Sequence, residues 1–262
     1  MDKRLVAASL AAVVIASSQS ATAFAQNVAD RTETAVTEAY KSGPDARLRY
    51  ARELFEHGMY VKAREIFSGY PHDMTASGYA VLCDVKMQSN GYETKLEKYI
   101  SEYPFSGMVP QLRFAHALNL FAADDYPSAS TEFAEVNVAG LYKNQLPEYT
   151  FKKAYSDFEI GLEEAARLGF MKVVGFPRND YQAPSCYSIG YIWYEREKFS
   201  QAQEWFEKSA KDQRFAEVSS YYIMECRFME KDYKYVTDHA AKMYASVPAE
   251  RKSHLARIIS ES

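Results

Sequence analysis

Histidines and paired acidic residues are the side chains of this 262-residue chain that acid–base chemistry or metal binding would need. The five histidines are scattered, at His57, His72, His116, His239 and His254. The sequence contains no HExxH pair, and no cysteines and histidines have the spacing of a zinc site. It also lacks the GxSxG turn of a nucleophilic serine and the GxxxxGK[ST] loop that holds phosphates. We therefore predict that the protein is not an enzyme and uses neither a metal ion nor another cofactor.

The acidic residues have a simpler explanation than catalysis. Asp124 and Asp125 stand at a predicted turn between two helices, where carboxylates cap the helix that follows. Glu163, Glu164 and Asp84 are expected on a solvated helix face or in the first turn of a helix. None of the five is predicted to act as a general acid or base.

The three cysteines are predicted to be buried thiols. Cys83, Cys186 and Cys226 are odd in number, have no CxxC spacing, and each falls within a helical pattern. A disulfide between Cys186 and Cys226 is the alternative, because an exported protein is able to form one.

The elements that would position any site repeat along the chain. In IGYIWYEREKFSQAQEWF (189–206), Ala202 follows Gly190 by twelve residues and Phe206 follows four residues later. The same layout recurs at Ala51, Ala63 and Phe67, at Ala117, Ala129 and Phe133, and at Ala154, Ala166 and Phe170, with looser copies at Asp84, Leu96 and Ile100 and at Met224, Val236 and Ala240. Successive copies lie 33 to 37 residues apart, which is typical of stacked two-helix repeats. Small residues are expected where two helices cross closely.

Turn and break signals agree with this period. Short polar or glycine-containing stretches separate the two helices of each repeat, at His57–Met59, Asn90–Gly91, Asp124–Asp125, Glu159–Gly161, Glu197–Lys198 and Lys231–Asp232. An aromatic residue often follows the turn at once. Proline-containing breaks separate successive repeats, at Tyr70–His72, Tyr103–Ser106, Val138–Pro147 and Gly175–Pro184.

These markers resemble those of tetratricopeptide-repeat (TPR) proteins over about residues 45 to 262. Tyr181–Pro184 and the stretch SCYSIGYIWYEREKFSQAQEWF that follows are similar to the long exported repeat proteins of Bacteroidetes cell envelopes. The resemblance implies an all-α fold, a right-handed TPR-type α-solenoid of about six helical hairpins plus a partial seventh. Most repeats lack the usual terminal proline, and the loops around Gly140 and Pro177 are longer than the family pattern.

The chain is predicted to have three parts. Residues 1–25 are a signal peptide, with charged Asp2–Arg4, an apolar run and a small-residue cleavage site at Ala23–Ala25. Residues 26–44 are a polar linker. The solenoid occupies 45–262, in units of approximately 45–70, 75–103, 108–137, 147–174, 182–211 and 216–246, with a partial unit at 249–262. We expect that partial unit to belong to a longer array; a capping helix is the alternative.

In TPR proteins the first helix of each repeat lines a concave groove. At the corresponding positions this chain has mostly aromatic residues, and the resemblance implies a partner-binding groove formed by Phe121, Phe151, Tyr155, Phe158, Tyr187, Tyr191, Tyr194, Tyr221 and Phe228. The alternative is that these rings are partly core. Trp193 and Phe206 are predicted to pack in the core.

The predicted function is a noncatalytic protein–protein interaction scaffold of the cell envelope, exported to the periplasm or associated with the outer membrane. Its partner would be a protein or peptide. Alternatives are an accessory subunit of outer-membrane or secretion assembly, and a carbohydrate-binding module whose tyrosines stack on a glycan. A net charge of −4 argues against nucleic acid, and no membrane span is predicted after signal cleavage.

Overall fold

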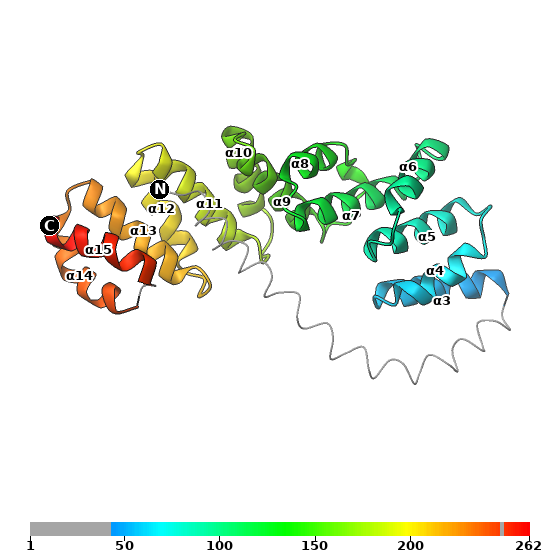
Figure 1. Cartoon of the computed structure of the whole chain (residues 1–262), viewed down its shortest axis with the longest axis horizontal. Coiled ribbons are helices and arrows are strands. Elements are labelled where there is room, and N and C mark those ends of the chain that lie inside the picture. The colour runs from blue at the N-terminus through cyan, green and yellow to red at the C-terminus, as the bar shows by residue number, and fades with distance from the viewer. Residues whose placement is uncertain (1–42, 247–248) are drawn as a thin grey trace. The chain divides into compact units, whose positions relative to one another are not determined.

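The computed structural model describes residues 43–246 and 249–262, and the predicted signal peptide and nearly all of the predicted linker lie outside these residues. The described residues form α-helices and one 3₁₀ turn, without strands, in two compact units (Figure 1). The first unit contains α3 (Pro44–Glu56), α4 (Tyr60–Ser68), α5 (Met74–Lys86), α6 (Tyr92–Glu102), α7 (Val109–Ala122), α8 (Tyr126–Ala134) and η2 (Val138–Gly140). The second contains α9 (Leu146–Glu159), α10 (Glu163–Val174), α11 (Gln182–Glu195), α12 (Phe199–Ser209), α13 (Ala216–Met229), α14 (Tyr233–Ser246) and α15 (Ala249–Glu261).

The first twelve of these α-helices form six hairpins, each with a first helix A and a second helix B. Every A helix from α3 to α13 ends in the same way, with one residue in the left-handed conformation: Gly58, Gln88, Asp124, Gly161, Glu197 and Lys231. The amide of the next residue then donates to a carbonyl five residues back, as Met59 does to Leu54 at 2.9 Å. This end motif satisfies carbonyls that the helix leaves unpaired and turns the chain back. Only two of the six positions are glycine, so the turn is recognisable from its hydrogen bonds rather than from composition.

The repeat markers are the core. The small residues at the helix crossings are buried, and so are the large residues one turn after them in four of the hairpins: Phe67, Phe133, Phe170 and Phe206. Gly190 shows why a small residue is needed, since a Cβ built there would lie 2.9 Å from the ring of Phe206. The predicted repeat is therefore confirmed by the packing.

Neighbouring helices pack in sequence order within each unit. The B helices α4, α10 and α12 each lie closely against the A helix that follows, and α14 packs on α15 in the same way. The described chain is thus an all-α solenoid of helical hairpins, as predicted. Helix α6 packs on α5, and its Leu96 and Tyr99 share a hydrophobic core with Leu112 and Ala115 of α7.

Three predictions about single side chains have different outcomes. Cys83, Cys186 and Cys226 are buried free thiols, as predicted, and burial raises the pKa of Cys186 to about 11. Phe206 is fully buried. The prediction that Trp193 packs in the core is wrong, because its side chain is half-buried. The guanidiniums of Arg167 and Arg196 lie 5.4 and 5.6 Å from the centre of its ring. Cation–π contacts keep this indole at the surface of the α10–α11 pair.

No helix within the described ranges combines the length and the apolar character needed to cross a membrane.

Candidate functional site

The nine aromatic residues predicted to line a groove do not form one exposed surface. Six of them are buried: Phe151, Tyr155, Phe158, Tyr187, Tyr191 and Tyr221. Three are partly exposed: Phe121, Tyr194 and Phe228. A ring that binds a partner needs exposed area, so most of these positions do not meet the condition for a groove.

The buried rings fill the space between successive A helices of the second unit. Tyr191 on α11 meets Phe158 of α9 and Tyr222 of α13 edge-on, at centroid distances of 6.1 and 5.9 Å. Tyr222 in turn stacks on Phe206 at 5.0 Å. Burial raises the pKa of Tyr222 to about 12 and that of Tyr191 further above its ordinary value. These rings are core residues that join α9, α11 and α13.

The partly exposed rings also have a packing role. Each lies edge-on against the aromatic residue that opens the next B helix, five positions later in the chain. These pairs are Phe121 with Tyr126 at 5.6 Å, Tyr194 with Phe199 at 5.9 Å and Phe228 with Tyr233 at 6.0 Å; Phe55 and Tyr60 form a similar tilted pair at 5.2 Å. The five-residue spacing of these aromatic pairs recurs along the sequence and indicates this packing.

Glu225, on α13 in the second unit, is a buried carboxylate in an aromatic surrounding. Its Oε1 accepts a hydrogen bond from the hydroxyl of Tyr221 and lies 2.8 Å from Nδ1 of His254 on α15. Nε2 of His254 lies 3.0 Å from Nη2 of Arg257. A guanidinium only donates hydrogen bonds, so Nε2 accepts and Nδ1 carries the proton, which faces the hydroxyl oxygen of Tyr221 at 2.9 Å as well as Glu225. This chain of polar contacts attaches α15 to α13.

Replacing His254 with Ala should weaken that attachment. The buried carboxylate would lose one of its polar partners, and hydrogen bonds to charged groups contribute about 1.5–3 kcal/mol. Because His254 is about one-third exposed, we expect a loss of about 1–2 kcal/mol in the free energy of unfolding. Urea denaturation followed by tryptophan fluorescence measures it. The control is His72→Ala, at an exposed loop position; an equal effect of both substitutions would contradict the role of His254.

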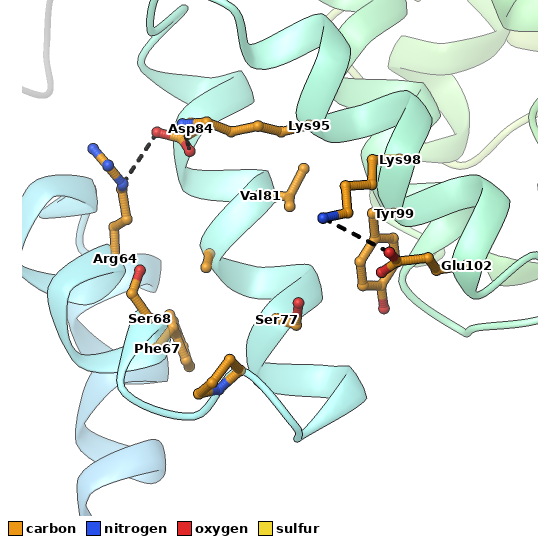
Figure 2. A pocket seen from close by; sticks show the side chains of 12 residues that line it. Arg64, Phe67, Ser68, Ser77, Val81, Asp84, Lys95, Lys98, Tyr99 and Glu102 are labelled. Atoms are coloured by element: carbon orange, nitrogen blue, oxygen red, sulfur yellow. Dashed lines mark hydrogen bonds and ion pairs between the residues drawn. The ribbon is translucent and has the colours of Figure 1, made fainter.

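The first unit contains a cleft between α4, α5 and α6, with a volume of about 400 Å³ (Figure 2). Helix α4 supplies one wall and α6 the opposite wall, with α5 between them. The lining is mixed, with the apolar side chains of Phe67, Pro71, Ala80 and Val81 beside charged and hydroxyl groups. The cleft exists because α4 and α6 stand apart on either side of α5.

The apolar part of the cleft is held in place by its neighbours. Phe67 stacks on Tyr79 with the ring centroids 4.9 Å apart. The hydroxyl of Tyr99 donates to the carbonyl of Met74 at 2.9 Å and lies 2.8 Å from Oγ of Ser106. A lining that is already fixed loses little side-chain entropy when a ligand binds.

Asp84, at one end of the cleft, corrects a prediction made from the sequence. It was expected on a solvated face, but it is 4% exposed. Its Oδ2 accepts from Nζ of Lys95 on α6 at 2.7 Å, and its Oδ1 lies 3.2 Å from Nε of Arg64 on α4. A buried charge needs such partners, and here they come from both walls of the cleft. The sequence feature that indicates this burial is the position of Asp84 in the repeat, where most other hairpins have alanine or glycine.

The other acidic predictions agree with the structure for Asp125, Glu163 and Glu164, whereas the side chain of Asp124 accepts from the hydroxyl of Tyr126 and not from an amide of α8. The side chain of Asp125 accepts from the amide of Ser128 and so caps α8. Glu163 and Glu164 lie in the first turn of α10.

A second cleft, of about 330 Å³, lies on the other side of α6. Its charged lining is mainly acidic, with Glu93, Glu97 and Glu132 against Arg113 and His116. Arg113 is committed to Glu132, with Nη1 at 3.1 and 3.2 Å from the two carboxylate oxygens. Helix α6 thus separates a cleft with a cationic excess from one with an acidic excess.

Comparison of the chain with models of protein families, with curated proteins and with solved structures gives no match. Across residues 43–246 and 249–262, no three histidine, cysteine or acidic side chains lie close enough together to hold a metal ion.

Proposed function

We propose that the protein is a noncatalytic scaffold of a bacterial cell envelope that binds a protein partner through a short peptide segment. The fold supports this, because stacked helical hairpins present long, rigid surfaces of the kind that repeat proteins use for binding. The finer assignments come from the sequence. Export rests on the predicted signal peptide, and the TPR-type repeats and a place in the periplasm or at the outer membrane of a Bacteroidetes-like envelope rest on the resemblance.

The cleft between α4, α5 and α6 is the observation that carries the proposal. Ligand sites in proteins are commonly clefts of about 300–1,000 Å³ with a mostly apolar lining and a few placed polar groups. This cleft is near the lower end of that range, which suits a few residues of a peptide rather than a folded domain. We therefore place the partner site here, and not at the predicted aromatic positions, most of which are buried.

The alternative functions have less support. Glycan binding was proposed because of Tyr155, Tyr187, Tyr191, Tyr194 and Tyr221, and of these only Tyr194 is partly exposed. A sugar stacks on the face of an exposed ring, so the remaining four offer it little area. A role as an accessory subunit of outer-membrane assembly is compatible with peptide binding, but no feature of the described residues favours it over a general scaffold.

Site-specific photo-crosslinking in cells that produce the protein tests the proposal. A photoreactive amino acid would replace Lys98 or Ser68, both exposed on the cleft walls. Matched controls are Thr94 and Lys62, which are exposed on the same two helices but do not line the cleft. We expect a discrete protein adduct from the cleft positions alone. Equal adducts from the control positions, or none from any position, would contradict the proposal.

A further inference from the structure

The cleft between α4, α5 and α6 has more positive than negative groups on its walls. Arg64, Lys95 and Lys98 line it, against the carboxylates of Asp84 and Glu102. Asp84 is enclosed behind the two cations that it contacts and offers almost no surface to a ligand. Glu102 is half-exposed and lies 3.8 Å from Nζ of the exposed Lys98, a distance at which the attraction is weak in water. A ligand that enters the cleft would therefore meet mainly cationic groups.

We infer that the cleft selects acidic peptide segments, in which an Asp or Glu side chain stands next to an aliphatic residue. This inference rests on the proposed peptide-binding function. The carboxylate of the peptide would lie toward Arg64, Lys95 and Lys98, and the aliphatic side chain would cover Ala80 and Val81. Carboxylates bind guanidinium and ammonium groups through short, charge-assisted hydrogen bonds.

Asp84 explains how the cations are positioned before a ligand arrives. One carboxylate on α5 contacts Nε of Arg64 from the α4 side and Nζ of Lys95 from the α6 side. The contact with Arg64 has ion-pair distance but not the alignment of a hydrogen bond, since Oδ1 of Asp84 lacks a hydrogen-bond donor. Arg64 and Lys95 keep side chains that are 43% and 46% exposed, so both can donate to a second carboxylate. Fixing two long side chains in advance lowers the entropy cost of binding.

Opposite charge on the two sides of α6 strengthens the choice of ligand. An acidic segment is attracted to the cleft that contains Lys95 and Lys98, and is repelled from the neighbouring cleft that contains Glu93 and Glu97. A basic segment would have the reverse preference. Rejection of the wrong partner by like charge is a common source of specificity.

The test is a selection from a displayed library of random ten-residue peptides on the immobilised full-length chain. We expect enrichment of Asp or Glu beside Leu, Ile or Val. A labelled peptide from the selection is then measured by fluorescence anisotropy against the double variant Lys95→Gln, Lys98→Gln. The expected loss of affinity is at least about tenfold, as is the loss when the acidic residue of the peptide becomes Gln or Asn. Because the pairing is ionic and partly exposed, affinity should also fall as salt is raised.

The control for that variant removes the same two charges elsewhere in the first unit, with Lys62→Gln and Lys143→Gln at exposed positions outside the cleft. This variant should bind as the unchanged chain does. Enriched peptides without acidic residues, or affinity equal in the two double variants, would overturn the inference and leave the proposed function standing. Competition by a ten-residue oligothymidylate as strong as that by the acidic peptide would also overturn it, because the cleft would then respond to charge alone. Failure to enrich any peptide would contradict the proposed function itself.

Discussion

Replacing Tyr191 with Ala should lower the free energy of unfolding by about 3–5 kcal/mol, the range measured when large aromatic core residues are truncated. Tyr191 is 1% exposed and meets rings from the helices before and after its own, at Phe158 and Tyr222. Its loss would leave a cavity at the centre of the second unit. Because neighbouring rings are themselves enclosed, they cannot move in to close it.

The measurement is urea denaturation followed by tryptophan fluorescence. Both tryptophans of the chain, Trp193 and Trp205, lie in the second unit, so their emission reports on the unit that contains Tyr191. Tyr233→Ala is the control, at a ring that is 39% exposed, and should cost much less. If Tyr191→Ala retained the midpoint of the unchanged chain, the ring would not be core, and the predicted aromatic groove would have to be considered again.

Replacing Gly190 with Leu should destabilise the protein by about 1–3 kcal/mol through overpacking. Even the Cβ of alanine would approach three atoms of the Phe206 ring at 2.9 to 3.1 Å. That ring cannot swing aside, because it is fully buried and lies parallel to Tyr222 at 5.0 Å. Helices α11 and α12 would have to separate.

Gly190→Ala is a second test, because helix propensity and steric conflict predict opposite changes in the free energy of unfolding. In a helix without steric conflict, Gly→Ala stabilises by about 1 kcal/mol. Here we expect a lower unfolding midpoint instead. Ala165→Leu, at an exposed position of α10, is the control for added bulk and should change stability by less than about 0.5 kcal/mol. A higher midpoint for Gly190→Ala would mean that α11 and α12 do not touch at this residue.

The sequence by itself determined the fold class and the helix pairs. Small residues such as Ala51, Ala117 and Gly190 recur with a period of about 34, and each lies at a buried helix crossing in the structure. Such a pattern is readable because it depends on residues close together in the chain: one turn of a helix, or one hairpin. The turns were predictable for the same reason, although residues such as Gln88 and Lys231 adopt the left-handed conformation without any glycine to indicate it.

Only the tertiary structure decided which side chains are exposed. The sequence placed Tyr187 and Tyr191 at groove positions, but their burial depends on how closely α9, α11 and α13 approach, which is set by contacts between repeats. The burial of Asp84 could not be predicted from local sequence, because its partners are 20 residues before it and 11 residues after it, on two other helices. The cleft beside α6 likewise exists because α4 and α6 stand apart on either side of α5, and no local pattern of residues expresses the distance between two helices.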